Sequence, residues 1–282
     1  IDPETSLEKL LINLSAKPKL LIDGLFGIGI NRVLDDGWID FISEINSQQL
    51  RVLSVDIPSG INATTGKVQG AAIRADETLT LGVPKIGLLN SESTDYVGRL
   101  RVAPEIGLVN LNETSNLQLN EVEDFSNFPP PRSVNGHKGT FGHIGIVGGS
   151  LGYHGAAVLA ARAASRSQPG LVTLMTPEEV FVPVASQLQS VMVHPLTPKN
   201  IEFKLATALL IGPGMAAKGL NKDIKEKTNQ IWHDSPLPIL LDASALDWIT
   251  TGEITSKSIR VITPHPGEAA RLLDCTSADI QA

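Results

Sequence analysis

The chain has 282 residues, 42% of them hydrophobic and 19% charged, which predicts about two globular domains with sizeable cores. A net charge of −7 argues against nucleic-acid or membrane-surface partners, and no apolar run reaches the roughly 18 residues of a transmembrane helix. The single cysteine, Cys275, excludes an internal disulfide and a cysteine-based zinc site.

Four short apolar runs in the first half predict strands, at residues 20–23, 51–56, 78–82 and 99–102. Between the first two, the apolar spacing of Trp38, Phe41, Ile42 and Ile45 predicts one buried face of a helix. Strands that alternate with a helix and loops predict a mostly parallel, doubly wound α/β sheet.

Two of these strands end in an acid, Asp23 and Asp56. Because parallel sheets bind ligands at the carboxyl ends of their strands, we expect both acids on one rim, where they can bind a cation, take a ribose hydroxyl or move a proton. The alternative is that each caps the turn after it. Asp56 is the stronger candidate, because the turn Asp-Ile-Pro-Ser-Gly is expected to hold it near the Ser59 hydroxyl. Lys85 is predicted to be a solvated loop residue rather than a phosphate ligand.

A change in composition separates the two halves. Residues 108–128 contain few aromatics, and three prolines at 129–131 follow, which is typical of a linker. The predicted boundary lies near residue 112, which gives domains at 1–112 and 113–282.

The second half opens with a glycine-rich stretch, residues 138–142, followed by an apolar run, 144–147, a glycine cluster, 148–152, and an alanine-rich helix. A strand, a glycine turn and a helix in this order let backbone N–H groups face a phosphate-bearing ligand. The alternative is a turn that simply needs glycine.

Further strands are predicted at residues 170–175, 208–211, 238–242 and 260–263, and their exits carry Gly212-Pro-Gly214, Asp242 and His265. This pattern predicts a second α/β domain with a site along one edge of its sheet. His265 stands between two prolines that restrict the backbone, which favours a ligand contact over a purely structural histidine. The other five histidines are predicted to be structural or solvated, and Cys275 to pack on a helix.

Several motifs in a fixed order carry a family resemblance, and they occur in both halves. They are Asp23–Arg32, Val55–Asn62, Thr65-Gly66, Gly82–Gly87, Lys138–Gly142, Gly148–Ser150, Gly155–Ala157, Gly212–Gly214, Leu241–Ala243 and Thr263–Glu268. The whole chain resembles the bifunctional NAD(P)H-hydrate repair enzymes. That family joins a Rossmann-like three-layer NAD(P)H-hydrate epimerase domain to an ADP- or ATP-dependent NAD(P)H-hydrate dehydratase domain of ribokinase-like α/β fold.

The resemblance implies a role for individual residues. In the first domain, Asp23 and Ser59 match potassium ligands, and Asp56 matches a substrate contact that we expect to be catalytic. The substrate-lining loop matches Gly27, Ile28, Gly29, Ile30, Asn31, Arg32 and Val33. In the second domain, Ala157, Gly214 and His265 match positions that contact the hydrated cofactor.

The expected function is nicotinamide nucleotide repair. The family interconverts the R and S forms of hydrated NADH and NADPH, and dehydrates the S form with ADP or ATP and Mg²⁺. We therefore expect K⁺, an adenine nucleotide and the hydrated dinucleotide as ligands, a homo-oligomer and a cytoplasmic location.

Two family segments are not in this sequence, an upstream Gly/Asn-rich loop and a downstream G-G-x-G-D loop with its lysine-bearing strand. The chain is therefore expected to be truncated at both ends and inactive as a dehydratase. The rival interpretations are a ribokinase-like small-molecule kinase, such as a vitamin-precursor kinase, and a non-catalytic binding module.

Overall fold

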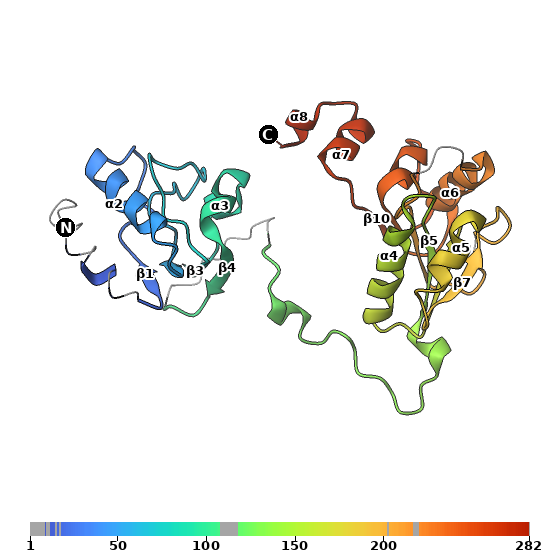
Figure 1. Ribbon diagram of the computed structural model, residues 1–282. Coiled ribbons are helices and arrows are strands. Elements are labelled where there is room, and N and C mark those ends of the chain that lie inside the picture. Colours follow the sequence, from blue (N-terminus) through green and yellow to red (C-terminus); the bar gives the residue numbers. More distant parts are fainter. Residues whose placement is uncertain are drawn as a thin grey trace. The chain divides into compact units, whose positions relative to one another are not determined.

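The computed structural model describes residues 9, 12–14, 16, 18–107, 118–201, 203–216 and 220–281. The chain divides into two compact units, unit 1 at Ile1–Ser126 and unit 2 at Asn127–Ala282 (Figure 1). The boundary predicted near residue 112 lies outside the described residues and stays a prediction. Among the helices described, none is both long enough and apolar enough to cross a membrane.

The four strands predicted in unit 1 are confirmed. They form one parallel sheet in the order β1-β2-β3-β4, with β1 at Leu21–Asp23, β2 at Val52–Val55, β3 at Glu77–Leu81 and β4 at Arg99–Ala103. Helix α2, Asp36–Ser47, links β1 to β2, and the short α3, Thr94–Val97, precedes β4. Since all four strands are parallel, their carboxyl ends lie at one edge of the sheet, which places the strand ends with Asp23 and Asp56 on the same rim, as predicted.

The core of unit 1 lies beneath α2. The predicted helical face is confirmed, because Phe41, Ile42 and Ile45 are buried against Val52 and Ile73, with Trp38 packed beside them. A second cluster forms around Ile57, Ile61 and Leu88, and involves the loop after β2. The helix begins at Asp35, whose carboxylate accepts a hydrogen bond from the Trp38 N–H at 3.1 Å. This cap orients α2 over the loop that follows β1.

Unit 2 contains a parallel sheet of six strands in the order β10-β9-β8-β5-β6-β7. The predicted strands are confirmed as β5 (His143–Val147), β6 (Leu171–Thr176), β8 (Ala208–Ile211), β9 (Ile239–Leu241) and β10 (Arg260–Ile262). The edge strand β7, Met192–Pro195, was not predicted. Its four residues, Met-Val-His-Pro, include a histidine and a proline, so they do not form a recognisable apolar run.

Helices cover both faces of this sheet. Adjacent residues of β5 point to opposite faces, so Ile146 packs with α4 (His154–Arg166) and α5 (Glu178–Ala185), whereas Val147 belongs to the cluster that contains α6 (Lys222–Asp234). Figure 1 shows α4 and α5 beside the sheet. The chain runs outward from β5 through β6 to β7, and then from β8 to β10 on the other side. The topological switch point therefore lies between β5 and β8, where such sheets bind ligands.

The prediction that Cys275 packs on a helix is wrong, because the thiol is exposed. Helix α7, Pro266–Leu273, ends at Asp274, which takes the left-handed conformation with φ 52°. Cys275 therefore lies in the turn before α8, Ser277–Gln281, rather than on a helical face.

Candidate functional site

The Asp23 carboxylate at the end of β1 is buried and fully engaged. Its oxygens accept four hydrogen bonds, from Ser59 Oγ at 2.6 Å, Ser54 Oγ at 2.8 Å, the Ser59 N–H at 2.9 Å and the Leu25 N–H at 3.3 Å. The residue is 2% exposed. Ser59 Oγ in turn accepts from the Phe26 N–H at 2.9 Å. Asp23 and Ser59 together thus anchor the first residues of the loop after β1.

Asp56, at the end of β2, takes part in a separate network. Its Oδ1 accepts a hydrogen bond from the Leu81 N–H at 3.0 Å and forms an ion pair with Lys85. Both carboxylates lie at the same edge of the sheet, as predicted. However, Ser59 bonds to Asp23, and the expected pairing of Ser59 with Asp56 is not seen.

The prediction that Lys85 is a solvated loop lysine is wrong. Its side chain is only 19% exposed, and its ammonium group donates to Asp56 Oδ1, to the Leu81 carbonyl at 2.8 Å and to Thr80 Oγ1 at 3.2 Å. The sequence motif Gly82-Val-Pro-Lys85 does not reveal this, because the turn after β3 directs the lysine back onto the strand end. The sequence did offer one signal for this contact. Lys85 follows β3 by four residues, and the neighbouring strand β2 is followed by an acid, Asp56.

The predicted substrate loop encloses a cavity of about 510 Å³. Six of the seven predicted residues line it, and the exception is Ile28, which is 64% exposed. The start of α2 adds Asp35 and Trp38 to the lining, and Trp38 meets Phe26 edge-on at 4.8 Å between ring centroids. The cavity thus combines glycine backbone, one arginine, Arg32, one acid, Asp35, and an aromatic pair, a lining suited to a polar molecule with a planar ring.

In unit 2, two glycine loops meet at the switch point of the sheet. The Gly149 N–H donates to the Pro213 carbonyl at 2.8 Å, and Ser150 Oγ donates to the Gly214 carbonyl at 2.6 Å. The loop after β5 and the loop after β8 are therefore joined. Gly214, predicted from the resemblance, lies at this junction.

Ala157 lies below this junction rather than on its surface. Its side chain is fully buried in the core between α4 and β5, whereas its neighbour Ala156 is partly exposed. A Cβ built at Gly214 would lie 3.0 Å from the Ala156 Cβ. A Cβ built at Gly149 would lie 3.1 Å from the Ala157 Cβ, so both alanines face the loop junction, and only Ala156 is also partly exposed.

Sequence reasoning missed Thr176, the last residue of β6. Its side chain is 0% exposed, and its hydroxyl has no hydrogen-bond partner among the described residues. A Cβ built at Gly149 would lie 2.8 Å from Thr176 Oγ1, and the φ of Gly149 is 87°. Glycine at this position therefore admits the hydroxyl beneath the loop. A polar residue at the end of an apolar run was the only sequence signal.

We expect the substitution Thr176→Val to stabilise unit 2 by about 1 kcal/mol, because it removes a buried hydroxyl that no group of the described residues satisfies. Thr173→Val, on the same strand, is the matched control. Thr173 Oγ1 bonds to His143 Nε2 at 2.8 Å, so its loss is expected to destabilise the unit by about 1 kcal/mol. Urea unfolding of both variants measures the two opposite changes. Destabilisation by Thr176→Val would show that the hydroxyl has a partner.

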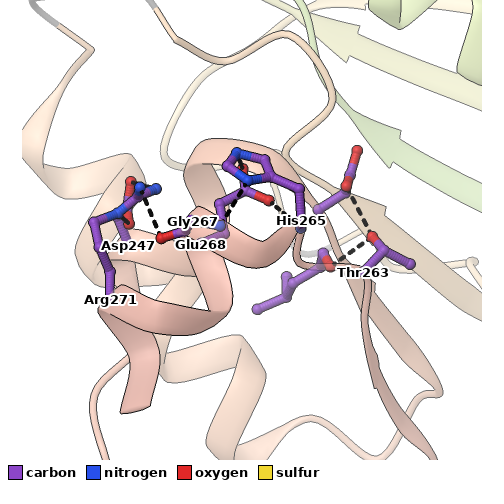
Figure 2. Close-up of polar contacts among 8 residues, drawn as sticks. Asp247, Thr263, His265, Gly267, Glu268 and Arg271 are labelled. Atoms are coloured by element: carbon purple, nitrogen blue, oxygen red, sulfur yellow. Dashed lines mark hydrogen bonds and ion pairs between the residues drawn. The ribbon is translucent and has the colours of Figure 1, made fainter. Parts of the chain in front are cut away.

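His265 is the N-cap of α7, as Figure 2 shows. The ring Nδ1 accepts a hydrogen bond from the Gly267 N–H at 3.1 Å. The backbone N–H of His265 donates to Glu268 Oε2 at 2.9 Å. In the neutral ring the proton is then on Nε2, which lies 3.5 Å from Glu268 Oε1. The side chain is 64% exposed. The ring direction is thus fixed, as predicted, but by a helix cap.

Two other polar contacts surround this cap (Figure 2). Thr263 Oγ1 donates to Asp242 Oδ1 at 2.8 Å, which ties the ends of β9 and β10 together. On α7, Arg271 bonds to Asp247 at 3.0 Å, and this hydrogen bond raises the pKa of the guanidinium above its ordinary value. Asp242 thus lies at the carboxyl edge of the sheet, directly after β9.

The part of the chain that the structure describes has no group of three or more His, Cys, Asp or Glu residues that can hold a metal ion. The predicted potassium ligands Asp23 and Ser59 supply oxygen donors of the type that a hard cation prefers. Their oxygens are bonded to each other, so an ion would have to replace the Ser59–Asp23 hydrogen bond.

Two family models match the chain. Residues 1–87 match the model described as YjeF-related protein N-terminus, and residues 144–281 match the model described as NAD(P)H-hydrate dehydratase. The two matches follow one another in the order that the motifs predicted.

Proteins with both domains are similar over most of this chain. The bifunctional NAD(P)H-hydrate repair enzyme Nnr of Dictyoglomus turgidum is 34% identical over 91% of this chain and 53% of its own length. The enzyme of the same name from Escherichia coli is 35% identical over 93% of this chain and 51% of its own. The chain thus spans about half the length of these curated relatives.

Among solved structures, the ADP/ATP-dependent NAD(P)H-hydrate dehydratase from Bacillus subtilis, co-crystallised with ATP and Mg²⁺, is 27% identical. The similarity covers 56% of this chain and 57% of that one, with a TM-score of 0.48. A hypothetical protein from Streptococcus mutans is 28% identical over 52% of this chain and 55% of its own, with a TM-score of 0.46.

Proposed function

We propose that this chain, which belongs to the bifunctional NAD(P)H-hydrate repair family, interconverts the R and S forms of hydrated NADH and NADPH in unit 1. Unit 2 contributes to dehydration of the S form with ADP or ATP. The observation that carries the proposal is the cavity of about 510 Å³ lined by the loop from Gly27 to Val33. We assign these activities to the complete protein, because the chain spans about half the length of its curated relatives.

Epimerisation requires the C6–O bond of the hydrated ring to break and form again on the other face. The ring nitrogen can supply its lone pair as the bond breaks, but a proton must reach the departing oxygen and later leave the incoming water. Asp56 is the proposed carrier of that proton. Its support is its place at the carboxyl end of β2, at the edge of the sheet where ligands bind.

The loop from Gly27 to Val33 is proposed to hold the dinucleotide. Glycine backbone lets the ligand approach closely, and the Arg32 guanidinium suits a phosphate. The same proposal includes K⁺ at Asp23 and Ser59, where it would offset charge near the substrate pyrophosphate.

In unit 2, the proposed substrate contacts are Gly214, His265 and the first turn of α4, where Ala157 lies. ADP or ATP with Mg²⁺ would convert the C6 hydroxyl into a leaving group by phosphorylation, and elimination of phosphate would restore the reduced cofactor. The joined glycine loops at the switch point support this location. His265 is proposed to orient the ring, and the glycines are proposed to let the dinucleotide approach the backbone closely.

A pair of variants separates the two roles of His265. His265→Asn retains a good N-cap but removes the imidazole, whereas His265→Ala removes both and is expected to destabilise α7 by about 1 kcal/mol. If the ring contacts substrate, both variants lower dehydration of the S form by about tenfold or more. Steady-state dehydration with thermal unfolding measures both effects. Full activity of His265→Asn would show that His265 caps α7 and does not contact the substrate.

The test of the proposed function uses the product of the complete reading frame. One epimer of hydrated NADPH is supplied with and without ADP or ATP, and the products are separated by chromatography. Interconversion without nucleotide, and NADPH formed only with nucleotide, is the expected result. Consumption of nucleotide without change in the hydrate would favour a small-molecule kinase, and binding without turnover would favour a binding module.

A homo-oligomeric state and a cytoplasmic location complete the proposal. The single cysteine is compatible with a reducing compartment. Light scattering on the purified protein and localisation of a tagged copy test these two points.

A further inference from the structure

Two neighbouring strands of unit 1 end in the same three-residue turn. After β2, the Ile57 N–H donates to the Val55 carbonyl at 3.0 Å, and the central residue is Asp56 with φ 72°. After β3, the Val83 N–H donates to the Leu81 carbonyl at 3.0 Å around Gly82, whose φ is 76°. This left-handed turn suits glycine and is strained for a residue with a side chain. Asp56 takes this conformation although it carries a side chain, as five other described non-glycine residues do.

The carboxylate of Asp56 is held from one side only. Oδ1 accepts from the Leu81 N–H at 3.0 Å and from Lys85, and the backbone N–H donates to the Leu79 carbonyl at 2.8 Å. Within the described residues, Oδ2 has no hydrogen-bond partner, and the side chain is 21% exposed. The anchored oxygen and the available oxygen are therefore distinct.

Lys85 has no donor left for a ligand. An ammonium group carries three N–H bonds, and those of Lys85 meet three acceptors, on Asp56, Thr80 and Leu81. Two of the acceptors belong to β3, so the ammonium group is fixed to that strand. From there it reaches across to the neighbouring strand end and holds the acid.

We infer that Lys85 is a positioning residue for epimerisation, which anchors Asp56 through Oδ1 so that Oδ2 faces the substrate and carries the proton. This inference rests on the proposed function, in which Asp56 handles the proton at the C6 oxygen. It excludes the other use of a lysine at this place, direct binding of a substrate phosphate. Without Lys85, Asp56 keeps a single anchor, the Leu81 N–H, and its carboxylate can rotate away from the reactive direction.

The experiment uses Lys85→Ala in the complete protein, with Lys67→Ala, an exposed lysine of the same unit, as the matched control. We expect the kcat of epimerisation to fall by about 10- to 100-fold with KM nearly unchanged, because substrate binding does not involve Lys85. Propylammonium, which replaces the deleted part of the side chain, is expected to restore part of the rate in Lys85→Ala and to leave Lys67→Ala unchanged.

Thr80→Val provides a second, milder variant, because it removes one acceptor of Lys85 without touching Asp56. A decrease of about 2- to 10-fold in kcat is expected. If Lys85→Ala fails to fold, this variant and Lys85→Met, which retains the apolar stem, decide the question through the same comparison of kcat with KM.

Each outcome bears on one claim. A raised KM with unchanged kcat in the Lys85 variants would assign the lysine to substrate binding and overturn the inference. Wild-type rates in Lys85→Ala would also overturn it. A wild-type protein that does not interconvert the epimers at all would instead refute the proposed function.

Discussion

Asp56→Asn is expected to lower the rate of epimerisation by about 10²- to 10⁴-fold while unit 1 stays folded, because the amide cannot carry the proton that a carboxylate carries. Asparagine is close in shape and tolerates the left-handed conformation of this position, where φ is 72°. Chromatographic measurement of R-to-S interconversion, starting from one purified epimer, gives the rate.

Asp40→Asn is the matched control for Asp56→Asn. Asp40 lies exposed on α2 of the same unit, so its substitution changes net charge equally and is expected to leave the rate unchanged. Thermal unfolding of both variants establishes that the fold is retained. Turnover of Asp56→Asn within a factor of two of the wild type would show that Asp56 does not carry the proton, and the carrier would then have to be sought among the residues that line the cavity.

Asp23→Ala is expected to destabilise unit 1 by about 3–5 kcal/mol. The substitution removes the acceptor of four hydrogen bonds at a residue that is 2% exposed. The two serine hydroxyls can rotate towards other acceptors, but the buried Ser59 N–H cannot, and it loses its partner. Denaturant unfolding, followed by circular dichroism, measures the change.

The loss at Asp23 is also expected to weaken ligand binding in unit 1. Ser59 Oγ holds the Phe26 N–H at 2.9 Å, and Phe26 lines the cavity, so release of Ser59 loosens the loop at its first residues. Asp40→Ala on the exposed face of α2 should change the free energy of unfolding by less than about 0.5 kcal/mol. Equal stability of the two variants would show that the four bonds contribute little.

Much of the fold was predictable because its strands carry local signals. Short apolar runs identified nine of the ten strands that the structure describes, since both faces of a parallel sheet are buried. Strand β7 carried no such signal, because it is a short edge strand with exposed residues at alternate positions. Helix ends were harder to place, as Cys275 shows, because a single left-handed residue, Asp274, ends α7 just before it.

The sequence alone determined the two α/β folds, the strand ends that carry Asp23 and Asp56, and the resemblance to the bifunctional NAD(P)H-hydrate repair enzymes, because short motifs and strand patterning can be recognised without the fold. Only the tertiary structure decided which of these groups meet. It paired Asp23 with Ser59, brought Lys85 onto Asp56, and placed the Thr176 hydroxyl beneath Gly149. Such contacts depend on how adjacent strands align and on where each turn directs the chain. The residues of one strand alone determine neither property.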